Sequence, residues 1–305
     1  MMNQTSEKNY LTNKIDFAVI FSVRNANPNG DPLNQNLPRQ DYEGHGEVSD
    51  VCLKRKIRNR LLDMGESIYV QSDDRRVDDF RSLKDRFDDA KIKGEDMATK
   101  ACDKWFDVRA FGQVFAFKGK GSKKNEATKE DSENSDAVSI GIRGPVTIQS
   151  AFSLETINPC SLQITKSVNL ETDKKQPDRK GSDTIGMKHR IDKAVYVTYG
   201  AISPQLASKT YFSDIDAEKI KLALQTLFKN DESSARPAGS MIVLKVIWWK
   251  HNCQSGQYSS AQVHDSLRKL ILGDGTFDEM ALNNSLPGLV PKLLEELVDA
   301  PTISI

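Results

Sequence analysis

"IDFAVIFSV", residues 15–23, carries a large apolar side chain at every second position. A repeat of two residues is the period of a β-strand, in which successive side chains point to opposite faces of the sheet. We therefore predict a first strand here, half-buried, with one face turned toward the core. The side chains on that face are Ile15, Phe17, Val19, Phe21 and Val23.

The composition is that of a soluble globular protein. The 305 residues are 38% hydrophobic and 28% charged, and no apolar run is long enough to cross a bilayer. The first ten residues lack the basic and then apolar plan of a signal peptide, so we expect a cytoplasmic protein without a membrane partner. Lysine plus arginine and aspartate plus glutamate both total 43, so any binding of nucleic acid must depend on local patches.

The sequence contains no recognisable motif for catalysis or cofactor binding. The four cysteines form no C-x-x-C pair, which argues against zinc knuckles and a disulfide framework, and no glycine-rich nucleotide motif or G-x-S-x-G occurs. Asp31, Asp41 and Asp50 could in principle bind Mg²⁺, but Asp50 is better explained as the start of a helix. "KHNC", residues 250–253, has no second pair of zinc ligands. We expect no metal, no cofactor and no catalytic residue.

A helix is predicted after the first strand, over "EVSDVCLKRKIRNRLLDMG", residues 47–65. Ser49 is a candidate N-cap and Gly65 a candidate C-cap. Arginine and lysine can bind successive phosphates of a strand, the first through a bidentate fork and the second as a point charge. Five cationic side chains lie within seven residues of this helix: Lys54, Arg55, Lys56, Arg58 and Arg60.

The loop "NANPNGDP", residues 25–32, connects that strand to that helix. Asn, Gly and Asp tolerate unusual backbone angles and leave N–H groups pointing outward, and a helix N-terminus close by favours an anion. The loop and one flank of the helix are therefore a candidate phosphate site. The alternative is an ordinary turn followed by a solvated helix face.

A second candidate is "GMKHR", residues 186–190, at the foot of a predicted hairpin. Lys188 could contact a nucleic acid backbone, His189 could stack or form a hydrogen bond, and Met187 could wedge against a base. A hairpin stem with ordinary surface charge is an equally good interpretation of this stretch alone.

The rest of the chain continues as alternating strand and helix patterns. Residues 72–107 suit a solvated amphipathic helical region, and residues 118–136 have almost nothing to bury, which predicts a mobile loop. The order strand, helix, strands, helix, strand is that of a ferredoxin-like unit, so the predicted fold class is α+β. The further predicted strands lie at 108–117, within 138–157, at 193–202 and at 241–249, the last covered on both faces. The further predicted helices lie at 213–228, 260–271 and 289–299.

Eight segments between residues 15 and 265 closely resemble the backbone subunit of CRISPR Cascade, in particular the subtype I-C (Csd-type) group. They are "NPNGDP", "LPRQD", "GEVSDVCLKRKIRNRL", "DVRAFGQVFA", "IRGPVTIQSAFS", "GMKHR", "YVTYGAISPQLA" and "SSARPAGSMIVLKVIWWKH". The resemblance implies a ferredoxin-like, RRM-like palm with an inserted helical finger region and a β-hairpin thumb. The palm is then expected over 1–65 with 108–117, 137–158 and 193–305, the finger region over 66–136, and the thumb over 159–192.

The resemblance also implies a function. Members assemble head to tail as a helical filament along the spacer of a CRISPR RNA and present this guide for pairing with target DNA in antiviral defence. Because one protein serves every spacer, recognition of the guide is expected through its backbone and shape. The implied partners are CRISPR RNA, the target DNA strand, other copies of the chain, the large, small and crRNA-processing subunits, and a recruited helicase-nuclease. A scaffold that binds only proteins through its charged helical region is a weaker alternative.

By the same resemblance, the first loop and the basic flank of the first helix line the RNA path, and "GMKHR" falls in the thumb. We expect replacement of Lys54 and Arg58 by alanine to weaken RNA binding without loss of the fold. Related type III backbone subunits carry a catalytic aspartate in their first loop, so a metal-dependent RNA endonuclease that uses Asp31 is the alternative function. Subtype I-C backbones resemble members that do not cut, and we interpret Asp31 as a turn residue. The predicted RNA-binding residues are Arg24, Asn27, Gly30, Arg39, Gln40, Lys54, Arg55, Arg58, Met187, Lys188 and His189.

Overall fold

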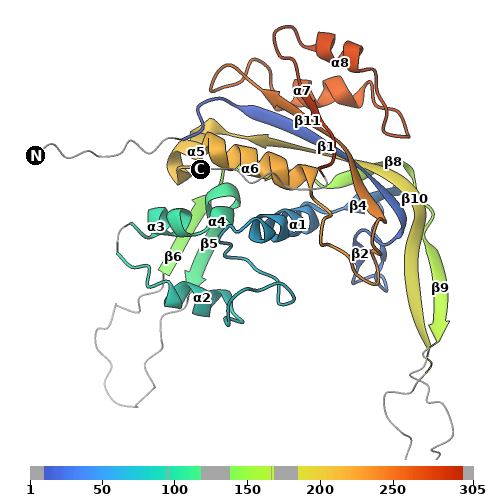
Figure 1. Ribbon diagram of the computed structural model, residues 1–305, viewed down its shortest axis with the longest axis horizontal. Coiled ribbons are helices and arrows are strands. Elements are labelled where there is room, and N and C mark those ends of the chain that lie inside the picture. Colours follow the sequence, from blue (N-terminus) through green and yellow to red (C-terminus); the bar gives the residue numbers. More distant parts are fainter. Residues whose placement is uncertain (1–9, 95, 118–137, 166, 168–184, 298–305) are drawn as a thin grey trace, which may run out of the picture.

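A large antiparallel sheet lies at the centre of the computed structural model, which describes residues 10–94, 96–117, 138–165, 167 and 185–297 (Figure 1). Within these ranges the strand order is β12-β11-β1-β10-β8-β4, and β7 and β9 pair with β10 beside that path. The predicted α+β class is confirmed. The strands of the sheet are β1 (Ile15–Ala26), β4 (His45–Val48), β7 (Val146–Ile148), β8 (Ala151–Thr156), β9 (Cys160–Thr165), β10 (Ile185–Ile202), β11 (Met241–Lys250) and β12 (Lys292–Leu294).

The first predicted strand is confirmed as β1, which lies between β10 and β11. It is buried on both faces rather than on one. Phe17 and Phe21 belong to a first core with α1 and α6, and Ile20 belongs to a second core with α7 and α8. The half-buried expectation was wrong because the C-terminal helices cover the face that the alternating pattern leaves to solvent (Figure 1). These helices are α1 (Asp50–Asp63), α6 (Asp214–Gln225), α7 (Ser260–Arg268) and α8 (Glu279–Ser285).

Both helices of the first core begin at the predicted caps. The Ser49 side chain accepts a hydrogen bond from the Cys52 backbone N–H at the start of α1, and Gly65 follows its end with a φ of +87°. This is the left-handed conformation that glycine adopts without strain. Ser213 and Asp216 form a reciprocal capping box at the start of α6. Short α5 (Pro204–Thr210) precedes it.

An inserted region follows α1 and has a small core of its own. Tyr69, Trp105 and Phe115 pack together there, and the Tyr69 and Trp105 rings lie 4.7 Å apart between centroids. The strand predicted at 108–117 was wrong over its first four residues, which are helical until Gly112 turns the chain with a φ of +80°. The two strands of this region pair with each other and not with the large sheet, and Phe115 of the first of them packs in the small core. Its elements are α2 (Leu83–Asp89), α3 (Met97–Lys104), α4 (Phe106–Phe111), β5 (Gly112–Phe117) and β6 (Val138–Arg143). The predicted mobile loop at 118–136 lies outside the described residues.

The predicted hairpin and the strand predicted at 193–202 share one continuous strand. β10 runs for 18 residues, pairing with β9 along its first part and with β1 along the rest. The hairpin therefore projects directly from the centre of the sheet (Figure 1). Its predicted polar tip lies outside the described residues.

The C-terminal part differs from the prediction after residue 288. The helix predicted at 289–299 was wrong within the described residues, because 292–294 form β12 and pair with β11, Leu294 lying opposite Val246. None of the described helices is long and apolar enough to span a membrane.

Candidate nucleic-acid interface

The loop that opens after β1 is a tightly braced turn. Asn27 is buried, donates from its side-chain amide to the Asn36 carbonyl at 2.8 Å, and donates from its backbone N–H to the Ala235 carbonyl at 2.9 Å. Gly30 packs closely against Asn36, because an added Cβ would lie 2.1 Å from the Asn36 Oδ1 and would require that side chain to move. Asn29 accepts two hydrogen bonds from Ser49, the N-cap of α1. The loop and the helix are therefore fixed to each other.

The carboxylates of this loop organise turns. Asp31 Oδ1 accepts the Leu33 N–H at 3.2 Å and lies 3.4 Å from the Arg39 guanidinium. Asp41 Oδ1 accepts the backbone N–H groups of Glu43 and His45. Two short strands, β2 (Gly30–Asp31) and β3 (Leu37–Pro38), pair across the loop. Within the described residues no three His, Cys, Asp or Glu side chains are grouped so that they could hold a metal ion.

Gln40 extends the bracing of the loop to the main sheet. Its side-chain amide donates to the Ile157 carbonyl at 2.9 Å and to the Gly44 carbonyl at 3.2 Å. Its backbone forms an isolated antiparallel bridge with Gly46 of β4. Arg39 is also tied to β4, because its carbonyl accepts the Glu47 N–H, so both predicted residues are held against the edge of the large sheet.

The three predicted cations of α1 point in different directions. Lys54 pairs with Asp50 one turn earlier at 2.9 Å. Arg55 is 57% exposed and contacts Asp74 at 3.0 Å. Arg58 is 15% exposed and donates to the buried Asp107 at 3.0 Å. On the predicted flank, Lys54 and Arg55 are therefore accessible, whereas Arg58 lies between α1 and the inserted region.

Two further cations of the same run are buried and have intramolecular partners. Lys56 forms an ion pair with Asp231, and Arg60 donates to the Thr226 hydroxyl and to Asp63. Burial lowers the pKa of Lys56, and the Asp231 carboxylate opposes that shift. Our expectation that all five cations could bind phosphates was wrong for these two, because the helix turns them toward the body of the protein.

A polar cleft of about 260 Å³ lies beside the opening loop. Gly30 of the loop and Arg55 of α1 line it, so the structure brings two of the predicted site residues together. Cationic and acidic side chains are mixed in its wall, and amide groups lie between them. Its charged lining residues are Arg55, Lys56, Asp74, Arg75, Asp231, Glu232 and Arg236.

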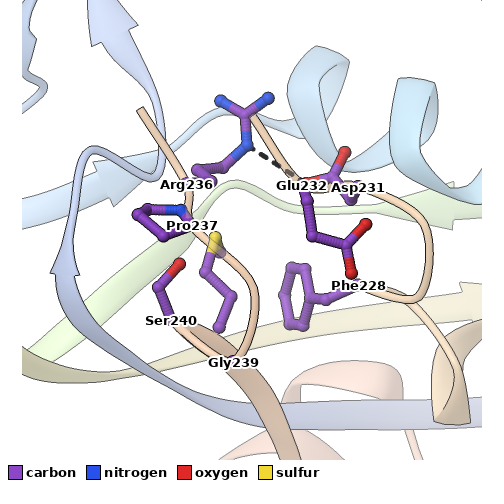
Figure 2. Close-up of a pocket in the computed structure, with 8 residues that line it drawn as sticks. Phe228, Asp231, Glu232, Arg236, Pro237, Gly239 and Ser240 are labelled. Atoms are coloured by element: carbon purple, nitrogen blue, oxygen red, sulfur yellow. Dashed lines mark hydrogen bonds and ion pairs between the residues drawn. The ribbon is translucent and has the colours of Figure 1, made fainter. Parts of the chain in front are cut away.

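Arg236 is a site residue that the sequence reasoning missed. Its guanidinium lies over the loop between α6 and β11, where Nε donates to Asp231 at 3.1 Å (Figure 2). The same loop reaches the opening loop through the Asn27 hydrogen bond to Ala235. The stretch "SSARPAGS", a polar segment with proline and glycine before a strand, was the pattern that could have identified it.

The hairpin begins at the same end of the sheet as the opening loop. Ala26, the last residue of β1, lies opposite Ile191 of β10, so the loop leaves the sheet where the hairpin does. Directly opposed residues of an antiparallel pair share a face. Met187 lies opposite Gln163 and His189 opposite Ser161, whereas Lys188 faces the other side.

The two faces of the hairpin differ in chemistry. One holds Met187, which is 52% exposed, and His189, whose Nδ1 is 2.8 Å from the Ser161 hydroxyl. The other holds Lys188 beside the exposed Leu162. The three predicted residues of the hairpin therefore cannot all contact the same side of one ligand.

Arg24 lies apart from the cleft. It is exposed near the end of β1 and lies opposite Lys193 of β10. Its backbone N–H donates to the Ser240 carbonyl at 2.7 Å, which ties the loop before β11 to this strand.

Comparison with known proteins identifies related chains. A family model described as "CRISPR-associated protein Cas7" matches residues 13–274. A curated protein of Haloferax volcanii, "CRISPR-associated protein Cas7", is 26% identical over 293 residues, which cover 93% of this chain and 83% of that protein. Among solved structures, a chain of "CRISPR RNA-guided surveillance complex, pre-nicking" is 13% identical with a TM-score of 0.48, covering 89% of this chain and 87% of that one. A chain of "CRISPR RNA-guided surveillance complex" is also 13% identical with a TM-score of 0.48, covering 95% and 93%.

Proposed function

Because the chain belongs to the CRISPR-associated Cas7 family, we propose that it is a backbone subunit that binds CRISPR RNA in a CRISPR effector complex. One observation carries this proposal from the structure. The opening loop, the cleft beside Arg55 and the base of the hairpin all lie at one end of the sheet. A single nucleic acid strand that follows this end would meet the exposed cation Arg55 and the polar wall of the cleft.

The finer assignment is a subtype I-C Cascade complex, in which copies of the chain form a filament along the spacer and present it for pairing with target DNA. The body then serves as a ferredoxin-like, RRM-like palm. Its support is the strand order β11-β1-β10-β8, with every neighbour antiparallel and with α1 and α6 in the connections. This is the order that two interleaved βαβ units produce.

In this assignment the residues act on the guide in two ways. Arg55 and Arg236, which line the cleft, bind phosphates without reading sequence, as a subunit that serves every spacer requires. Met187 and His189 of the hairpin contact bases or sugars from one face, and Lys188 contacts backbone or a neighbouring copy from the other. The large, small and crRNA-processing subunits and a recruited helicase-nuclease are the further proposed partners in the cytoplasm.

We further propose that the chain does not cut nucleic acid. Asp31 is engaged with the Leu33 N–H and Arg39, as a residue that shapes a turn would be. RNA complementary to the guide should therefore stay intact during incubation of the loaded protein with Mg²⁺. Regular cleavage that Asp31→Ala abolishes would establish the endonuclease function instead.

The test of RNA binding is to purify the full chain at low salt, sequence any bound nucleic acid, and measure the particle size before and after ribonuclease. We expect repeat-spacer RNA in a large particle that ribonuclease dissociates. If the chain is free of nucleic acid, a synthetic repeat-spacer RNA is added and the size is measured again. Failure to bind this RNA, alone or with the partner subunits, would contradict the proposal.

A further inference from the structure

Two exposed cations face each other across the centre of the sheet. Arg24 of β1 lies directly opposite Lys193 of β10, and both are exposed. Val23, which precedes Arg24, belongs to the first core, and Ala194, which follows Lys193, packs against that core. Because side chains alternate along a strand, Arg24 and Lys193 project from the opposite face, the one that α7 and α8 cover in part.

No described residue neutralises this pair. Neither side chain forms an ion pair or a hydrogen bond within the described part of the chain, whereas Arg55 and Arg58 of α1 are both paired. Directly opposed like charges destabilise a pair of strands. Lys193 acts electrostatically on Asp274, but the pKa of that carboxyl is lowered first by hydrogen bonds from Thr276 and only last by Lys193. The pair therefore retains a net positive charge.

The surroundings leave this part of the face accessible. The loop after α7 crosses the sheet at Gly275, where an added Cβ would lie 2.9 Å from the Val195 side chain and 3.1 Å from Ile20. Lys193 lies two residues beyond Val195 in the direction of the hairpin, and Arg24 lies beside it. Ile242, on the same face, is 38% exposed. The cations thus lie between the covered half of the sheet and the base of the hairpin.

We propose that Arg24 and Lys193 form a phosphate clamp that binds the backbone of a single nucleic acid strand on the face of the sheet opposite α1. This inference rests on the proposed function and adds a second line of contact to it, separate from the cleft beside Arg55. An arginine and a lysine at one cross-strand spacing combine a bidentate fork with a point charge, which suits one phosphodiester group held between them. The strand is the guide RNA or the DNA paired with it.

The experiment measures binding of the full chain to fluorescently labelled single-stranded repeat-spacer RNA over a series of salt concentrations. R24Q/K193Q is compared with K269Q/K292Q, which removes the same charge from two exposed lysines, one at the C-terminal cap of α7 and one on β12. Each phosphate contact to a single strand contributes about 0.7 to the slope of log affinity against log salt. Because the two side chains hold one phosphate between them, we expect the slope for R24Q/K193Q to fall by about 0.7 and the slope for the control to stay unchanged.

A second arm identifies the strand and uses complementary DNA added to the RNA-loaded protein. If R24Q/K193Q lowers the salt slope of RNA binding, the clamp holds the guide. If it lowers only the salt slope of DNA binding to the RNA-loaded protein, the clamp holds the target strand. Slopes equal to those of the control in both arms would overturn the clamp, while normal RNA binding by the unmodified chain would leave the proposed function standing. An unmodified chain that binds no RNA would overturn both.

A third measurement separates binding from folding. R24E places a negative charge on β1 directly opposite Lys193 of β10. It should therefore raise Tm, while weakening RNA binding more than R24Q does. A fall in both Tm and affinity would show that Arg24 serves the fold, and the clamp would then be rejected.

Discussion

Arg55 and Arg58 lie one turn apart on α1, yet only one of them is available to a ligand. Arg55 lines the cleft and pairs with an exposed carboxylate. Arg58 lies over the Phe111 ring and donates to Asp107, a carboxylate that also accepts the Tyr69 and Val70 N–H groups. Removing Arg58 would leave that buried carboxylate without its charged partner, so the expectation that its loss spares the fold no longer holds.

Alanine replacements at these two positions should therefore have opposite consequences. Arg58→Ala should reduce the free energy of unfolding by about 3 kcal/mol, because it breaks a buried pair from one side. Arg55→Ala should change it by less than about 0.5 kcal/mol and should lower the salt slope of RNA binding by about 0.7. Urea unfolding and anisotropy titration measure the two quantities. Equal stability of the two variants would contradict the structural role of Arg58.

A buried ionisable group at the start of β1 links stability to pH. Asp16 is fully buried, accepts from His251 Nε2 at 2.8 Å and lies 3.0 Å from Lys14 Nζ. Burial raises the pKa of Asp16, but these partners outweigh it and hold the pKa below its ordinary value. Burial lowers the pKa of His264, which lies 3.5 Å from the same carboxylate and donates to the Gly200 carbonyl.

The sign of the pH effect follows from proton uptake. The pKa of His264 is lowered in the folded chain, so near and below pH 6.5 the unfolded chain takes up a proton at His264 more readily than the folded chain does. The free energy of unfolding therefore falls as the pH drops. The lowered pKa of Asp16 adds a further loss near pH 4 and below. His264→Gln, which retains a donor for Gly200, should flatten the decline in unfolding free energy between pH 7 and 5. His189→Gln on the hairpin should not, and equal slopes for the two variants would refute this origin.

At the scale of elements, the sequence predicted what local patterns specify. The strand at residues 15–23, the N-caps Ser49 and Ser213, and the left-handed Gly65 after α1 each depend on residues close together in the chain, and all are present in the structure. β12 was missed because its partner is β11, more than forty residues earlier, and its apolar spacing fits a helix equally well. Pairing across such a separation leaves no local pattern to read.

For the candidate site, the sequence likewise predicted the contiguous segments but not the direction of their side chains. The opening loop and the flank at Arg55 are contiguous stretches, so their positions could be inferred from the chain alone. The direction of each cation on α1 depends on which acids the body places nearby, as Asp107 and Asp231 show for Arg58 and Lys56. Arg236 lies in the loop before β11, and the pairing of β11 with β1 brings that loop beside the opening loop and the cleft.

Strand β10 offers a test of the close packing at the centre of the sheet. At Gly200 an added Cβ would lie 2.2 Å from the Phe17 ring and 2.5 Å from the Thr147 carbonyl, and the ring is itself stacked on Trp248. Gly200→Ala should cost about 2 kcal/mol through overpacking. Gly186→Ala, in the hairpin part of the same strand, meets only Ile164 at 3.4 Å and should cost less than about 0.5 kcal/mol. Thermal and urea unfolding check both values, and a similar cost at the two sites would refute the argument.

At the scale of the whole molecule, the inserted region is held to the body by ion pairs as well as by packing. Its small core is separate from the two cores of the sheet. Among the described residues, five ion pairs cross the boundary: Arg58 with Asp107, Arg55 with Asp74, Arg75 with Asp63, Arg109 with Asp216, and Lys219 with Glu66. Arg109 makes the most extensive of these contacts, because both Asp216 oxygens accept from it and a third N–H donates to the Cys102 carbonyl.

The loss of Arg109 should therefore loosen the inserted region before it unfolds the sheet. Arg109→Ala leaves Asp216, at the start of α6, without its bidentate partner, and regions with fewer buried contacts open at lower free energy than the central strands. We expect amide hydrogen exchange to quicken at least tenfold in α3 and α4 and to stay unchanged in β1 and β10. Arg268→Ala, which removes an exposed pair with Asp265 on α7, is the matched control and should change neither. If β1 exchanges faster to the same degree as α4, the inserted region and the sheet form one cooperative unit and this division of the molecule is incorrect.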